Sequence, residues 1–176
     1  MRLLIAGIII FFISFYFYLI WPRLSHRRQI RPFLHTMFAH RGYHCIEKGI
    51  PENSLSSFRA AISHGYGIEL DVHTSADGEL IVMHDETVDR VTDGTGLIKD
   101  MTLAQLKELK VSTPAEPNGI YRVPTLAEVL DLMRTTDMMV NIELKNSICF
   151  YPGMEEKILK LVKEMNMEDQ LIYSSF

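Results

Sequence analysis

The sequence has few cysteines, no acidic residue near its amino terminus and no excess of basic residues beyond it. Cys45 and Cys149 are its only cysteines, and they have neither metal-site spacing nor the pattern of a disulfide framework, so they leave the cellular compartment open. All 22 acidic residues lie beyond residue 36, together with 13 of the 18 basic ones. This acidic balance argues against a nucleic-acid partner.

Charge is also absent from residues 3–21, whose sequence is LLIAGIIIFFISFYFYLIW. As a helix this segment would be about 28 Å long, which matches the core of a bilayer. A buried globular helix would keep a polar stripe, and a cleaved signal peptide would have a shorter apolar region without crowded aromatic residues at its end. We therefore expect a transmembrane helix over residues 1–21, a basic linker over residues 22–36 and a globular domain over residues 37–176.

The basic residues around this segment suggest an orientation. Four arginines follow it, whereas Arg2 and the terminal amine precede it. The positive-inside rule then places the globular domain in the cytoplasm. These patterns predict a single-pass membrane protein whose contact with the bilayer is made by residues 3–21.

The rest of the chain alternates segments with the periods of strands and of helices. Strand patterns occur at residues 37–40, 67–73, 79–84, 138–145 and 171–176. Helical patterns follow Asn53-Ser54, follow capping boxes at Thr102–Gln105 and Thr125–Glu128, and cover residues 154–165. This alternation predicts parallel βαβ units, in either a doubly wound sheet or a barrel.

Acidic residues fall at alternate positions of two predicted strands. Residues two apart on a strand point to the same side, so Glu69 lies beside Asp71, and Glu143 lies beside Lys145. Buried carboxylates cost free energy unless a positive charge neutralises them. Because no cysteine is nearby, the three carboxylates of Glu69, Asp71 and Glu143 predict a hard divalent cation, Mg²⁺ or Ca²⁺.

Two histidines and two cations complete a candidate site at the strand ends. His40 and His84 follow predicted strands and could transfer protons near neutral pH. Arg41 and Lys145 could hold an anionic phosphate. Taken alone, each residue also has a plainer interpretation. His40, for example, could be an ordinary core or surface histidine. Their coincidence at strand ends, where parallel α/β folds place chemistry, favours a site for phosphoryl chemistry.

The plainer alternatives for the charged pairs are a solvated strand face and a salt bridge. An isolated Glu69-x-Asp71 pattern is often a solvated face, and Glu143 with Lys145 could be a salt bridge. His73 and Asn141 are at most candidates for supporting contacts behind the site.

The order and spacing of these residues resemble the glycerophosphodiester phosphodiesterase domain, from about residue 37 to the end of the chain. The matching motifs are His40-Arg41-Gly42, Pro51-Glu52-Asn53-Ser54, Glu69-Leu70-Asp71-Val72, His84-Asp85, Arg90 with Thr92, Gly94 and Gly96, Pro124-Thr125-Leu126, and Asn141-Ile142-Glu143-Leu144-Lys145. The resemblance implies a TIM-like (β/α)8 barrel of the membrane-anchored bacterial type. We count four main strands, so the chain is expected to be the amino-terminal half of a barrel that needs eight.

The resemblance also implies roles for the site residues. Glu69, Asp71 and Glu143 would hold a divalent metal, while His40 and His84 would be the acid and base. We favour His40 as the base and His84 as the acid, and the reverse assignment stays open.

Three further residues would bind substrate. Arg41 and Lys145 would hold the phosphate, and Glu52 lies where the family lines the mouth of the pocket. The implied reaction, part of phospholipid and glycerol metabolism, hydrolyses a glycerophosphodiester to sn-glycerol 3-phosphate and an alcohol.

Two other functions stay open at this point. The chain could be an inactive fragment or a membrane-bound interaction module, and self-association could complete the barrel. A related lysophospholipase D-type activity on lysophospholipids would use the same metal motif.

Overall fold

A computed structural model describes residues 2–21 and 31–175 of the protein. The chain divides into two units, residues 1–35 and 36–176. The first unit contains helix α1 (Arg2–Ile20) and a short 3-10 helix, η2 (Arg31–Phe33). The predicted linker over residues 22–36 lies largely outside the described residues.

The prediction of a membrane localisation is wrong. A helix that crosses the hydrocarbon core needs about 20 apolar residues. Among the helices that the structure describes, none has the length and apolar character required to cross a membrane. The predicted transmembrane helix over residues 1–21, its contact with a bilayer through residues 3–21 and the cytoplasmic orientation derived from it therefore lose their basis.

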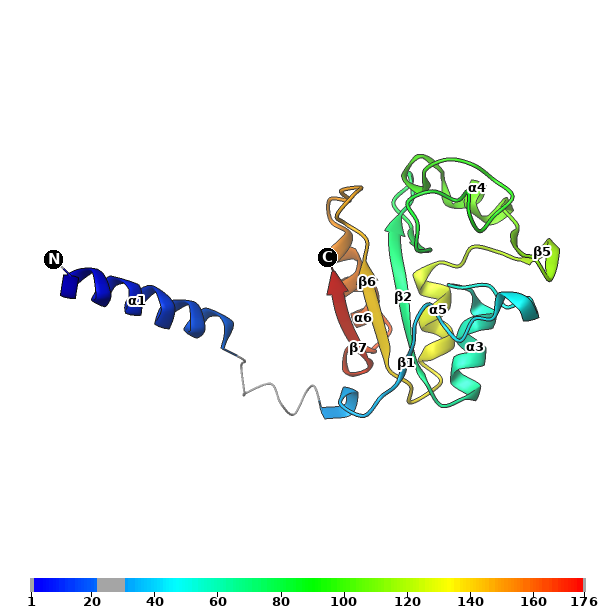
Figure 1. The fold of residues 1–176 in the computed structure, drawn as a ribbon. Helices are drawn as coiled ribbons and strands as arrows, with labels where there is room; N and C mark the ends of the chain where they lie inside the picture. The colour runs from blue at the N-terminus through cyan, green and yellow to red at the C-terminus, as the bar shows by residue number, and fades with distance from the viewer. Residues whose placement is uncertain (1, 22–30, 176) are drawn as a thin grey trace. The chain divides into compact units, whose positions relative to one another are not determined.

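The second unit is built on four parallel strands in the order β1-β2-β6-β7 (Figure 1). Strand β3 pairs with β2 in the antiparallel direction. These strands are β1 (Phe38–Ala39), β2 (Gly67–Thr74), β3 (Leu80–Val82), β6 (Val140–Leu144) and β7 (Leu171–Ser175). A separate antiparallel pair consists of β4 (Val111–Thr113) and β5 (Glu116–Tyr121). The described residues thus give the predicted parallel α/β arrangement, and the β4–β5 pair was not predicted.

Helices connect the parallel strands, as a parallel sheet requires. They are α3 (Leu55–Ser63), α4 (Leu103–Glu108), α5 (Leu126–Met133) and α6 (Met154–Glu164), with the 3-10 helices η3 (Ile46–Lys48), η4 (Ile98–Asp100) and η5 (Glu168–Gln170). The capping boxes predicted at Thr102 and Thr125 are both confirmed, because each hydroxyl accepts a bond from the backbone three residues on.

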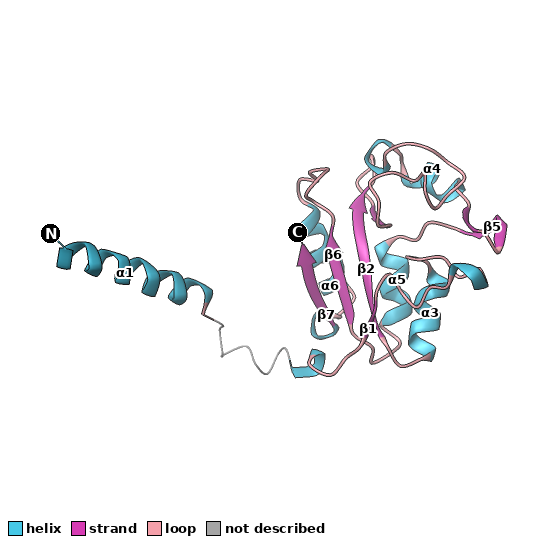
Figure 2. Cartoon of the chain, viewed as in Figure 1, coloured by secondary structure: helices cyan, strands magenta, loops and turns pink. Residues whose placement is uncertain are grey.

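Alternation along β2 gives the sheet two different faces. Ile68, Leu70 and Val72 are fully buried and belong to the main core, which also contains residues of α3, α5 and α6. Figure 2 shows these helices and the parallel strands of the sheet. The residues between Ile68, Leu70 and Val72 point to the opposite face. Glu69 and Asp71 are therefore carried side by side on that second face, as the sequence predicts.

The main core should dominate the stability of this unit. We expect Leu70→Ala to lower the free energy of unfolding by about 2–5 kcal/mol, because Leu70 is fully buried and the substitution leaves a cavity. Leu159→Ala is the matched control, since Leu159 on α6 is 56% exposed. Urea denaturation of both variants measures the difference, and equal losses would show that Leu70 is not part of a packed core.

Candidate functional site

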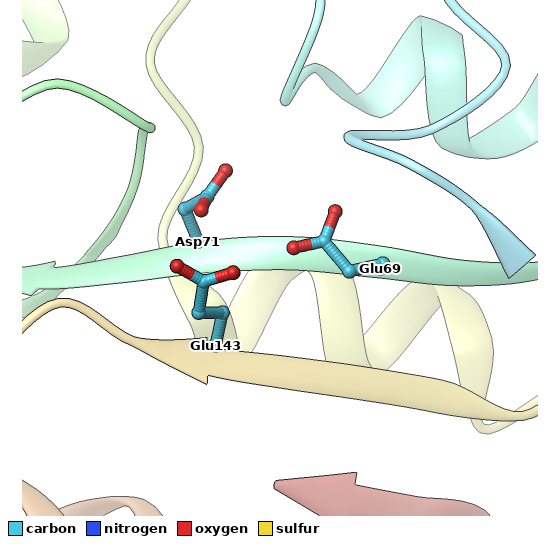
Figure 3. Close-up of side chains that lie close together, drawn as sticks. All are labelled: Glu69, Asp71 and Glu143. Atoms are coloured by element: carbon cyan, nitrogen blue, oxygen red, sulfur yellow. The ribbon is translucent and has the colours of Figure 1, made fainter. Parts of the chain in front are cut away.

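Three carboxylates meet on the second face of the sheet. One oxygen from each of Glu69, Asp71 and Glu143 lies within 4.8 Å of the other two. Asp71 and Glu143 are paired across β2 and β6, and Glu69 is two residues before Asp71 on the same strand (Figure 3). The parallel register, together with the period of two, therefore assembles the set that the sequence predicts.

Asp71 is the most enclosed of the three, with 1% of its surface exposed. Asn53 Nδ2 donates a 2.8 Å hydrogen bond to its Oδ2, and Arg41 Nε lies 3.6 Å from the same oxygen. Lys145 Nζ lies 3.0 Å from Oδ1 and also pairs with Glu143. Although burial disfavours the charged amine, these two carboxylates raise the pKa of Lys145. An ammonium group thus neutralises part of the cluster.

Glu69 is less well compensated. Its Oε2 accepts a 2.8 Å hydrogen bond from the backbone N–H of Arg41, whereas its buried Oε1 has no hydrogen-bond partner among the residues that the structure describes. Burial, together with the charges of Asp71 and Glu143, raises the pKa of Glu69 to about 7. A free carboxylate oxygen beside two other carboxylates fits a divalent cation, which would favour the ionised form.

The turn after β1 has an unusual backbone that brings Arg41 to the cluster. Arg41 and Asn53 both have positive φ angles, 55° and 49°, which non-glycine residues seldom adopt. The N–H of Asn53 donates a 2.9 Å hydrogen bond to the carbonyl of Arg41 and holds the two segments together. Gly42, at φ 79°, is required here because a Cβ would lie 2.3 Å from Ser57 Oγ.

A second network joins the predicted acid His84 to the predicted substrate residue Glu52. His84 Nδ1 lies 2.6 Å from Asp85 Oδ1, and Arg90 Nε donates a 2.7 Å bond to Asp85 Oδ2. Arg90 also donates to both oxygens of Glu52, while Arg41 Nη1 donates to Glu52 Oε1 at 3.1 Å. The hydrogen bond from Arg90 contributes most to lowering the pKa of Asp85 to about 2.

The structure brings most of the predicted site residues together. Arg41, Lys145 and the three carboxylates share direct contacts, and the Glu52–Arg90–Asp85 chain connects them to His84. His40 directly follows β1, and its side chain is exposed.

Sequence reasoning assigned no role in the site to Asn53, Asp85 or Arg90. All three lie in the motifs that carry the resemblance, and this was the one signal that could have identified them. Their partners are distant in the sequence, since Arg90 and Glu52 are 38 residues apart, so spacing alone could not reveal the bonds.

Known proteins match this chain over the same unit. Residues 40–176 match the Glycerophosphoryl diester phosphodiesterase family. A Glycerophosphodiester phosphodiesterase of Caldanaerobacter subterraneus is 47% identical over 142 residues, which are 80% of this chain and 57% of that protein. The human Glycerophosphodiester phosphodiesterase 1 is 32% identical, over 80% of this chain and 40% of that protein. The matched part of this chain therefore spans 57% of the first of these relatives and 40% of the second.

Solved structures share the fold. A glycerophosphodiester phosphodiesterase from Agrobacterium tumefaciens is 34% identical with a TM-score of 0.68, over 80% of this chain and 58% of that one. An Oleispira antarctica phosphodiesterase in complex with the product sn-glycerol-3-phosphate is 33% identical with a TM-score of 0.67, over 83% of this chain and 59% of that one. The family match of the sequence and the TIM-barrel-like α/β fold agree, and the chain therefore belongs to the glycerophosphoryl diester phosphodiesterase family.

Proposed function

We propose that residues 37–176 form the amino-terminal part of an enzyme that hydrolyses glycerophosphodiesters to sn-glycerol 3-phosphate and an alcohol. The observation that carries this proposal is the meeting of three carboxylates with the cations of Arg41 and Lys145, together with a histidine, His84, that is hydrogen-bonded to Asp85 and connected to this cluster through Arg90 and Glu52. The product named for the Oleispira relative is sn-glycerol-3-phosphate, which supports the substrate class. The described residues supply four parallel strands, so further strands would be needed to close a barrel.

Glu69, Asp71 and Glu143 would hold the metal in this proposal. An all-oxygen set favours Mg²⁺ or Ca²⁺ over zinc, and the free Oε1 of Glu69 offers an unused ligand atom. When bound, such an ion supplies Lewis-acid polarisation of a phosphoryl oxygen.

Arg41 and Lys145 would bind the phosphate. Both side chains are mostly enclosed and stand beside Asp71, with Arg41 Nη1 tied to Glu52. Their charges are thus held in place before an anion arrives, which lowers the cost of orienting them. Glu52 would act here through Arg41, at the mouth of the pocket that the resemblance implies.

His84 is suited to protonate the leaving alkoxide. The carboxylate of Asp85 can only accept a hydrogen bond, so His84 Nδ1 donates to it and the opposite nitrogen, Nε2, is left for a substrate. His40, on the turn that follows β1, would then be the base, as the sequence suggests.

A direct assay tests the proposed reaction. We expect the full 176-residue chain to release sn-glycerol 3-phosphate from glycerophosphocholine when Mg²⁺ or Ca²⁺ is present, and a chelator to stop the release because the carboxylates would lose their ion. Enzyme-coupled detection of the product measures the rate. Release that persists in excess chelator would contradict metal dependence, and no release under any condition would count against this chain as a sufficient catalyst.

The two histidines should be needed for turnover. His40→Ala and His84→Ala should each lower kcat by about 10²–10⁴-fold, the usual contribution of a general acid or base. His64→Ala is the control, because His64 is an exposed histidine at the end of α3. A His84→Ala variant with the wild-type kcat would remove His84 from the mechanism, and the same result at His40 would remove that assignment.

A further inference from the structure

His73 lies on β2, two residues beyond Asp71, and is completely buried. Its two ring nitrogens contact two different loops. Nε2 lies 3.1 Å from the backbone carbonyl oxygen of His84, and Nδ1 lies 3.2 Å from the hydroxyl of Tyr151. The Tyr151 ring packs edge-on against the imidazole, with ring centroids 5.9 Å apart.

The chemistry of these partners sets the direction of both hydrogen bonds. A carbonyl oxygen can only accept, so Nε2 of His73 must carry a hydrogen and donate it to His84. In a neutral imidazole the other nitrogen is then an acceptor, and the Tyr151 hydroxyl donates to it.

The bridged loops are those that carry two of the proposed site residues. His84 is at the start of the loop after β3, and Tyr151 is in the loop after Lys145, where its own N–H donates a 2.6 Å bond to Asn146 Oδ1. The neighbouring residue on β2, Val72, accepts a 3.1 Å bond from the backbone N–H of Lys145. Adjacent residues of one central strand thus hold the backbones of both loops.

We propose that His73 is a positioning residue, whose buried imidazole fixes His84 relative to the Lys145 loop by joining the His84 carbonyl to Tyr151. This inference rests on the proposed function in that it assumes a catalytic role for His84. His73 itself touches no reacting atom. Its contribution is to prevent the His84 backbone from moving away from the cations and carboxylates of the site.

Two variants of His73 with amide side chains distinguish its hydrogen bond to the His84 carbonyl from its hydrogen bond with Tyr151. The side-chain amide of Gln reaches about as far as Nε2 of histidine, so His73→Gln keeps a donor toward His84. The shorter His73→Asn places its amide near the Nδ1 position and loses that donor. We expect kcat of His73→Asn to fall by about tenfold with KM within about twofold, since misplaced catalytic groups slow the reaction more than they weaken binding. His73→Gln should recover most of kcat.

Controls distinguish positioning from loss of folding. His64→Asn makes the same change at an exposed histidine and should leave kcat unchanged. Tyr151→Phe removes only the hydroxyl that orients the His73 ring, so kcat should fall less than in His73→Asn. Equal kcat values for the Asn and Gln variants, or a His73→Asn variant with unchanged kcat, would overturn the proposal.

A spectroscopic measurement tests the same bridge without relying on turnover. In the ¹⁵N-labelled full chain, His73 should show a protonated Nε2 and an unprotonated Nδ1 at neutral pH. A His73 ring that is protonated at Nδ1 alone would contradict the bridge even in an active protein. If the wild-type chain releases no product while His73 has the expected tautomer, the proposed reaction fails for this chain but the bridge stands.

Discussion

The burial of Glu69 and Asp71 side by side on β2 is the constraint on which the rest of this site depends. Two carboxylates that leave water together are costly, because each loses solvation and each repels the other. The fold compensates Asp71 with the Asn53 amide and with two cations, and it compensates Glu69 with a backbone N–H. One oxygen of Glu69 is left without a partner in the described chain, and a divalent cation is the natural complement to it.

The need to compensate these buried carboxylates also explains the backbone of a turn that is distant from β2 in the sequence. The backbone N–H of Arg41 reaches Glu69 only because the turn after β1 adopts positive φ angles at Arg41 and Gly42, with Asn53 positive as well. Such strain persists where the surrounding contacts hold it, and it is concentrated here at the candidate site. On the other face of β2, Leu70 and its neighbours supply the apolar packing that keeps the strand in place.

Much of this arrangement was predictable from the sequence because its causes are local. Capping boxes predicted the start of two helices, and the alternation of polar and apolar residues predicted that Glu69 and Asp71 share a face. The bridge from Arg90 to Glu52 and the contact of His73 with Tyr151 join residues 38 and 78 positions apart, so only the folded chain could reveal them. The membrane prediction for residues 3–21 rested on the length and apolar character of that segment and on the arginines around it, and it is wrong.

Binding of a divalent cation by the three carboxylates is the central claim, and calorimetric titration tests it most directly. Mg²⁺ or Ca²⁺ would be titrated into the full chain, into Glu69→Gln and into Glu156→Gln, which alters an exposed glutamate of α6. The account predicts saturable binding to the full chain, unchanged in Glu156→Gln and weakened at least about tenfold in Glu69→Gln, because a neutral amide is a poorer ligand than a carboxylate. Equal affinity in all three proteins, or no binding by the full chain, would contradict it.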